Sequence, residues 1–248
     1  MCDAFKKPVA GGPLNRRSFL KVPTALAAVG LVVGSPCGSR AYADVLTREQ
    51  RDKMTPDEIL ASMKHGNERF RKGEEPKRDF LVEQRALAKG QYPAAMILSC
   101  IDSRAPAEVI MDLGLGNAFN ARVAGNVANE DILGSMEFAC KVAGAKVVLV
   151  LGHTACGAVK GAIDNVELGN LTTLLAKIRP AVKATEFNGE RSSKNPAFVD
   201  AVARKNVELT MAQLLEKSPV LRELQSKRAI KVAGAMYNLA TATVEFFA

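Results

Sequence analysis

The fold of this chain is decided by the stretch Lys146-Val147-Val148-Leu149-Val150-Leu151-Gly152-His153-Thr154-Ala155-Cys156. A second stretch, residues 94–104, has the same order of parts. Each begins with a short apolar run that does not alternate with polar residues, which is typical of a strand buried on both faces of a parallel sheet. Polar side chains and then a helix-like segment follow each run. The pattern predicts two β-then-α units of an α/β protein, with these polar side chains at the carboxyl ends of neighbouring strands.

The side chains behind the two runs are those of a zinc site. They comprise two thiols, Cys100 and Cys156, one imidazole, His153, and one carboxylate, Asp102. Thiolate and imidazole suit a borderline-soft d¹⁰ cation, and a carboxylate can fill or vacate the fourth position of a tetrahedron. Cys156 precedes a helix start, where amide dipoles favour its thiolate. The set therefore predicts a Zn²⁺ site of the catalytic kind.

A simpler interpretation applies to each cysteine taken alone. Free cysteine is among the most buried residue types, so Cys100 or Cys156 by itself is more typical of a core residue than of a ligand. A metal-free redox or structural pair is the corresponding alternative. The chain has only two histidines, however, and one of them lies between a buried strand and a cysteine-bearing loop. That scarcity favours the metal site.

Several further strings carry a resemblance to a known family. They are Ser99–Arg104, Ala118-Phe119, Arg122–Asn126, Gly134–Ala139 and Val148–Val159. Together they resemble the β-class carbonic anhydrases, from about Leu60 to the C-terminus. The resemblance implies a zinc enzyme that reversibly hydrates carbon dioxide to bicarbonate and a proton. It also implies an α/β fold with a mostly parallel central sheet flanked by helices, an N-terminal helical arm, and assembly as a homodimer or a tetramer of dimers.

Site residues follow from the resemblance position by position. Cys100, His153 and Cys156 match the zinc ligands, and Asp102 with Arg104 matches the catalytic dyad. Asp102 is also a possible fourth ligand in a closed state. A guanidinium two residues away can hold the carboxylate bidentately and keep it off the metal.

Two further features concern the substrate. The backbone N–H groups of the turn at Gly157, at a helix start, are candidates to bind the developing bicarbonate. The chain departs from the family at Asn117, where an aspartate is frequent, and at Asn120, where an apolar strand residue is usual. Neither position belongs to the predicted ligand set, so the departures bear on the substrate cleft.

Two alternative functions use the same residues. The first is hydrolysis of carbon disulfide or carbonyl sulfide on the same zinc site, but no sequence feature narrows access to the site as such a specificity would require. The second is a non-catalytic zinc-binding or redox protein. Asp102 and Arg104 argue against it, because a structural zinc site is closed by a fourth protein ligand and needs no such pair.

Residues 1–43 have the features of an export signal. The twin-arginine string Asn15–Lys21 is followed by a modestly apolar stretch, residues 22–33, and by the small-x-small sequence Ala41-Tyr42-Ala43. A transmembrane anchor is the alternative, but Pro23 interrupts the stretch, which is shorter than the roughly 20 residues needed to span a bilayer. We expect a bacterial protein exported by the twin-arginine route to the periplasm or beyond, with no membrane anchor after cleavage.

Charge and cysteine count limit the partners of the mature chain. Residues 1–43 hold six basic residues and one acid, so they account for +5 of the formal +8. The remainder is too weakly basic to predict nucleic-acid binding.

Three cysteines remain after residue 43, and an odd number argues against a disulfide framework. Cys140, inside the apolar stretch 132–143, is interpreted as a core thiol.

The predicted organisation has three parts: the signal at 1–43, a helical arm and linker at 44–92, and a zinc-binding catalytic domain at 93–248. Thr55-Pro56 begins a helix that ends near Lys72, and a basic, polar linker leads to Tyr92. By resemblance the arm packs on a partner subunit, and His65 on it is exposed or at that interface. Strands are expected near 94–99, 119–124, 146–151 and 229–236, long helices near 168–184 and 197–217, and a loop at 188–196.

Overall fold

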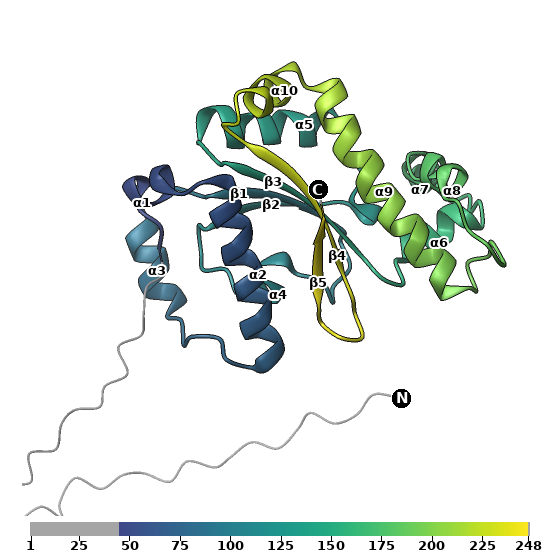
Figure 1. Ribbon diagram of the computed structural model, residues 1–248, viewed down its shortest axis with the longest axis horizontal. Coiled ribbons are helices and arrows are strands. Elements are labelled where there is room, and N and C mark those ends of the chain that lie inside the picture. The colour runs from purple at the N-terminus through teal and green to yellow at the C-terminus, as the bar shows by residue number, and fades with distance from the viewer. Residues whose placement is uncertain (1–44, 248) are drawn as a thin grey trace, which may run out of the picture. The chain divides into compact units, whose positions relative to one another are not determined.

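The computed structural model describes residues 45–247, which belong to one compact unit. Its centre is a five-stranded sheet of order β2-β1-β3-β4-β5 (Figure 1). The strands are β1 (Ala95–Ser99), β2 (Ala118–Arg122), β3 (Val147–His153), β4 (Lys231–Tyr237) and β5 (Val244–Phe247). All neighbouring pairs are parallel except β4 and β5. The mostly parallel α/β sheet expected from the sequence is confirmed, and the antiparallel β5 is an addition.

The apolar runs are buried on both faces, as their lack of alternation predicts. Along β1, Met96 and Leu98 enter one hydrophobic cluster, whereas Ala95 and Ile97 enter another on the opposite face. The first face is covered by α5 (Glu130–Glu137), α6 (Gly157–Ile163), α9 (Pro196–Lys217) and α10 (Pro219–Ser226), and the second by α2 (Pro56–Lys72) and α4 (Ala107–Ile110). Figure 1 shows α9 and α2 on opposite sides of the sheet.

The arm helix α2 begins where the sequence predicts. The Thr55 side chain accepts a hydrogen bond from the Glu58 amide, and the Glu58 side chain accepts one from the Thr55 amide, which is a complete capping box. Gly73 ends the helix in the left-handed conformation, with φ at 67°. Ile59 and Met63 are buried against the sheet of the same chain. These residues of the arm thus pack within the chain, and packing of the arm on a partner subunit stays a prediction.

The predicted linker up to Tyr92 contains a helix at residues 80–87 that its polar composition does not indicate. Helix α3 (Phe80–Leu87) forms there, and α1 (Arg48–Lys53) precedes the arm helix. The Asp79 carboxylate caps α3 by accepting hydrogen bonds from the Leu81 and Val82 amides. The carboxylate of Glu83, which is fully buried, accepts a hydrogen bond from the Leu115 amide at 2.9 Å. Capping and this long-range contact outweigh the polar composition.

The helix expected near 168–184 is two helices, α7 (Gly169–Ala176) and α8 (Arg179–Ala184). Pro180 gives the reason, because its ring would clash with the carbonyl of the residue four positions earlier in a continuous helix.

The stretch 132–143 continues from α5 into a π-helical turn, η2 (Phe138–Val142), where Cys140 is buried as expected. His65 is exposed on α2.

The predicted export signal lies outside the described residues. Within residues 45–247, no helix combines the length and apolar character needed to cross a bilayer.

Candidate metal centre and active site

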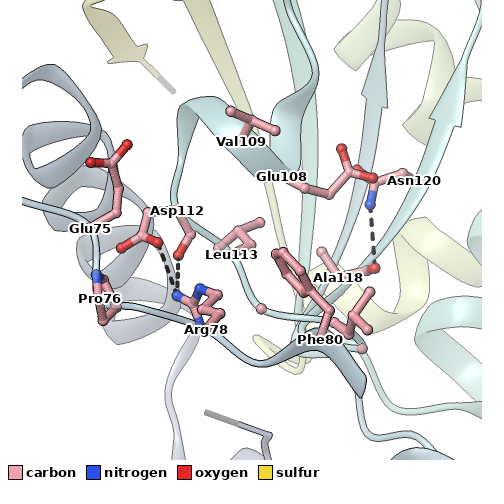
Figure 2. A pocket seen from close by; sticks show the side chains of 13 residues that line it. Glu75, Pro76, Arg78, Phe80, Glu108, Val109, Asp112, Leu113, Ala118 and Asn120 are labelled. Carbon is pink, nitrogen blue, oxygen red and sulfur yellow. Dashed lines mark hydrogen bonds and ion pairs between the residues drawn. The ribbon is translucent and has the colours of Figure 1, made fainter. Parts of the chain in front are cut away.

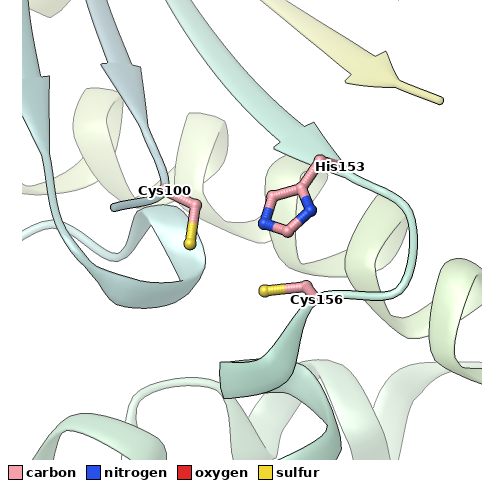
Figure 3. A group of neighbouring side chains, drawn as sticks. All are labelled: Cys100, His153 and Cys156. Atoms are coloured by element: carbon pink, nitrogen blue, oxygen red, sulfur yellow. The ribbon is translucent and has the colours of Figure 1, made fainter. Parts of the chain in front are cut away.

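Three predicted ligands meet at the carboxyl edge of the sheet. Cys100 follows β1 directly, His153 is the last residue of β3, and Cys156 is the N-cap of α6. Strands β1 and β3 are hydrogen-bonded neighbours in parallel register, so residues that leave them at the same end lie close together. The Sγ atoms and a ring nitrogen all lie within 4.8 Å of one another, and all three residues are buried. Figure 3 shows the two sulfurs and the imidazole converging on one point.

The orientation of His153 leaves one ring nitrogen available. Nδ1 lies 2.9 Å from the carbonyl oxygen of Thr154. A carbonyl only accepts, so Nδ1 carries the proton of a neutral ring. Nε2 is buried and has no hydrogen-bond partner within the described part of the chain. Metal-bound imidazoles have this arrangement, in which a backbone carbonyl fixes the tautomer and the other nitrogen faces the ion.

The two thiols affect each other's ionisation. A hydrogen bond from the Cys156 side chain lowers the pKa of the Cys100 thiol, and the Gly125 amide adds a second donor 3.3 Å from Cys100 Sγ. The pKa of Cys156 is raised, first by that bond to Cys100 and then by burial. A thiolate therefore forms readily in the pair. Two sulfurs and one imidazole nitrogen fit a tetrahedral zinc site with a fourth position left for water or substrate.

Asp102 and Arg104 form a bidentate ion pair beside the sulfurs. The Asp102 Oδ1 and Oδ2 atoms accept from Arg104 Nε at 2.9 Å and Nη2 at 2.8 Å. The hydrogen bonds from Arg104 hold the pKa of the Asp102 carboxyl well below its usual range. Asp102 Oδ2 lies 3.9 Å from His153 Nε2, so the carboxylate borders the metal-ligand cluster. Its side chain is 15% exposed, against 60% for Arg104, which places the carboxylate between the cluster and the surface.

Arg122, at the end of the edge strand β2, supports this loop. Its Nε donates to the carbonyl oxygen of Cys100 at 2.9 Å, and its Nη2 donates to that of Asp102 at 2.5 Å. The guanidinium thus fixes the backbone on both sides of Ile101. The sequence singles out Arg122 only as part of a family string, and its contacts depend on the pairing of β2 with β1.

The loop from His153 to Cys156 is held from two sides. The Thr154 amide donates to the carbonyl of Tyr237, and the Thr154 hydroxyl accepts from the Leu239 amide. The Ala155 amide donates to Asp200 Oδ1 at 2.8 Å. The local sequence does not mark Asp200 as part of the site, because Asp200 lies on α9, 45 residues after Ala155.

Helix α9 makes a second contact near the cluster. The buried Asn206 side chain donates to the carbonyl of Gly125 at 2.8 Å, and it is the amide of Gly125 that donates to the Cys100 sulfur. Gly157, the predicted substrate-binding amide, is the exposed first residue of α6, and a side chain there would meet only open space. Its contact with substrate stays a prediction.

A separate hollow lies on the side of β2 and does not include the cysteine cluster (Figure 2). Phe80 of α3 and Val109 of α4 form its apolar walls. Arg78 lies at its edge, where Nη2 donates to Asp112 Oδ1 at 3.0 Å and Nη1 lies 3.6 Å from Glu83 Oε1. This ion-pair network ties the chain before α3 to the end of α4. Asn120, one of the family departures, lines the same hollow and not the ligand cluster.

The fold and the site together define a class: an α/β protein with a mostly parallel sheet and a buried Cys-His-Cys cluster at the carboxyl edge of that sheet. Comparison with known proteins identifies the family. Residues 95–244 match the family model described as carbonic anhydrase. Carbonic anhydrase 2 of Mycobacterium tuberculosis is 35% identical over 184 residues, which cover 72% of this chain and 86% of that protein. The carbonic anhydrase of Mycolicibacterium smegmatis is 32% identical and covers 74% and 89%.

Solved structures agree with the sequence relatives. A β-carbonic anhydrase of Aspergillus fumigatus superposes with a TM-score of 0.60 at 25% identity, over 77% of this chain and 89% of that chain. A tetrameric β-carbonic anhydrase of Sordaria macrospora gives 0.58 at 25% identity, over 66% and 84%. The chain belongs to the β-carbonic anhydrase family, and it is an enzyme of the carbonic anhydrase kind.

Proposed function

We propose that this enzyme reversibly hydrates carbon dioxide to bicarbonate and a proton on one Zn²⁺ ion held by Cys100, His153 and Cys156. The observation that carries the proposal is the buried Nε2 of His153, which has no hydrogen-bond partner among the described residues and belongs to a cluster whose ligand atoms lie within 4.8 Å of one another. A purely structural zinc site would close the tetrahedron with a fourth protein ligand. Here the next acidic group, Asp102, is engaged by Arg104 instead.

The chemistry divides between the ion and the chain. Zinc bound at such a site lowers the pKa of a coordinated water molecule and makes it a nucleophile near neutral pH. Cys100 and Cys156 bind the cation as thiolates and largely offset its charge. His153 binds through Nε2. Its protonated Nδ1 donates a hydrogen bond to the Thr154 carbonyl, which fixes the ring.

Asp102 orients the reacting water. Oδ1 accepts from both the backbone amide and Nε of Arg104, whereas Oδ2 accepts only from Nη2 and keeps a lone pair for one more hydrogen bond. A carboxylate held in this way accepts a hydrogen bond from the reacting water. That bond directs a lone pair of the water oxygen at carbon dioxide. Arg104 restrains the carboxylate, so it does not rotate toward the sulfurs. The Gly157 amide is the candidate donor to the developing bicarbonate.

A stopped-flow assay of carbon dioxide hydration tests the proposal. The protein is stripped with a chelator and then reloaded with one equivalent of zinc or of magnesium. We expect rapid hydration only in the zinc-loaded sample, since hard, oxygen-seeking magnesium does not suit thiolate ligands. Hydration that is equally fast after stripping would contradict a metal-dependent site. Turnover of carbonyl sulfide or carbon disulfide with no hydration would favour the alternative substrates.

We also propose that the chain forms a homodimer or a tetramer of dimers. Within residues 45–247, strand β2 pairs only with β1, and Phe80, which lines the hollow beside β2, is 56% exposed. Exposed apolar groups of this size beside a free strand edge are typical of subunit interfaces. Sedimentation equilibrium is expected to give a multiple of the chain mass, and a monomer at micromolar concentration would contradict the proposal.

Export by the twin-arginine route is a further proposal, supported by the string Asn15–Lys21 and the small-x-small sequence that ends at Ala43. Its test is fractionation of bacterial cells that express the full chain. The wild type is expected in the periplasm or medium, and the double variant Arg16→Lys/Arg17→Lys is expected to stay in the cytoplasm. Equal distribution of both proteins would exclude this route.

A further inference from the structure

Ala155 has an unusual backbone conformation for its residue type. It lies between the ligands His153 and Cys156, and its φ is 54°, in the left-handed region. Residues with a Cβ rarely adopt this conformation, whereas glycine adopts it freely. Something in the surrounding structure must therefore hold the loop in this shape. The loop geometry decides whether the imidazole and the second sulfur face the same point.

The group that holds Ala155 is the carboxylate of Asp200. Its Oδ1 accepts the Ala155 amide at 2.8 Å, a charge-assisted hydrogen bond of ordinary length. Among residues 45–247, Asp200 forms no ion pair and no other side-chain hydrogen bond. It is half-buried on α9, a 22-residue helix that packs on β3 through buried apolar side chains. A rigid element thus presents one charged acceptor to one strained amide.

We propose that Asp200 is a positioning residue for the metal centre, which it preorganises by holding Ala155 in the left-handed conformation. The inference rests on the proposed zinc site and adds to it a residue outside the ligand set and the Asp102–Arg104 pair. Without this acceptor, the loop relaxes toward ordinary backbone angles and Cys156 moves relative to His153. Outer groups of this kind, when removed, typically weaken metal affinity by about 10- to 100-fold.

The test measures zinc affinity directly, by competition with a chromophoric chelator. Asp200→Ala is expected to weaken zinc binding by about 10- to 100-fold. Asp200→Asn keeps an acceptor oxygen at the same place and is expected to recover most of that loss. The matched control is Glu216→Ala, which removes an exposed carboxylate from the same helix without touching the loop. It is expected to bind zinc like the wild type.

A rescue variant separates positioning from a general effect on folding. Ala155→Gly places glycine where the left-handed φ costs little, so the loop no longer depends on Asp200. In the double variant Asp200→Ala/Ala155→Gly, zinc affinity is expected to return close to that of Ala155→Gly alone. Cobalt substitution adds a spectroscopic readout, because the thiolate-to-cobalt band reports the ligand geometry. The band is expected to shift in Asp200→Ala and to return in the double variant.

Each outcome bears on one claim. If the wild type binds no zinc, the proposed function fails before Asp200 is tested. If the wild type binds zinc and Asp200→Ala binds it equally well, the positioning role is overturned and the zinc site stands. If Asp200→Ala is impaired but Ala155→Gly gives no rescue, the carboxylate acts by another route and the inference about Ala155 is wrong. Circular dichroism of each variant shows that the comparison is between folded proteins.

Discussion

The amide nitrogen of Gly125 lies 3.3 Å from the Sγ of Cys100 and donates a hydrogen bond to it. Gly125 belongs to the short turn η1 (Ala124–Asn126), which follows the edge strand β2, whereas Cys100 follows β1. The turn has φ of 67° at Gly125, and Asn206 of α9 holds its carbonyl. One predicted metal ligand is thus stabilised by a backbone group that only the pairing of β2 with β1 brings near.

Gly125→Ala is expected to destabilise the protein and weaken its zinc binding. A Cβ at this position would lie 2.5 Å from Cδ1 of Ile178, and the left-handed φ adds about 1–2 kcal/mol of strain. The matched control is Gly134→Ala on α5, where a Cβ meets nothing within 4 Å. That change should stabilise the protein by about 0.5–1 kcal/mol, since glycine is a poor helix former. Chemical denaturation and zinc stoichiometry measure both, and similar behaviour of the two variants would refute the packing argument.

Cys156→Ala is expected to abolish stoichiometric zinc binding. It removes one of three protein ligands from a site in which metal binding and local folding are coupled. The control is Cys140→Ala, because Cys140 is an equally buried thiol that lies in the core and not in the cluster. Atomic absorption after dialysis against a chelator is the measurement. Full, chelator-resistant zinc in Cys156→Ala would remove this residue from the ligand set.

Asp102→Asn and Arg104→Ala are expected to retain zinc and lose most of the hydration activity. The first change weakens the acceptor that orients the reacting water. The second frees the carboxylate to move into the ligand cluster, since its Oδ2 already lies 3.9 Å from His153 Nε2. Arg71→Ala, on the exposed side of α2, serves as the control for loss of a surface arginine. A fall in kcat/KM of less than about tenfold, or some 1.4 kcal/mol, would show that the pair is not catalytic.

Alkaline pH is expected to reveal the burial of Cys140. Burial raises the pKa of this thiol to about 12, whereas an unfolded cysteine titrates near about 8.5. The folded state therefore keeps the proton that the unfolded state loses. The resulting contribution to stability is fully present below about pH 8.5, and it declines as the pH rises from there toward about 12.

The measurement is urea unfolding of the wild type and Cys140→Ala between about pH 8 and 10.5. Above about pH 9 the stability advantage of the wild type should shrink by up to about 1.4 kcal/mol per pH unit, because only the wild type carries this thiol. A constant difference between the two proteins across this range would mean that the folded protein does not keep the thiol protonated. Alkylation of native protein at about pH 8 should also leave Cys140 unmodified.

The sequence by itself determined the parts of the molecule whose information is local. The unalternating runs before Cys100 and before His153 predict two buried parallel strands, and both strands form. Thr55-Pro56 predicts the start of α2 because capping involves only residues within one turn. The ligand types are likewise readable, since two thiols and a histidine behind buried strands suit only a few metals. The resemblance then indicated the family, which the comparisons confirm.

Only the tertiary structure decided the parts that depend on residues far apart in the chain. Asp79 and the buried Glu83 make α3 helical inside a polar stretch, and Glu83 does so through the Leu115 amide, 32 residues away. The buried apolar side chains of the arm helix α2 pack on the sheet of the same chain. Asp200 holds Ala155 across 45 residues, and nothing in the local sequence marks either one. The ligand types follow from residue identity, but the contact of Asp200 with the ligand loop depends on how α9 packs on the sheet, which no local pattern encodes.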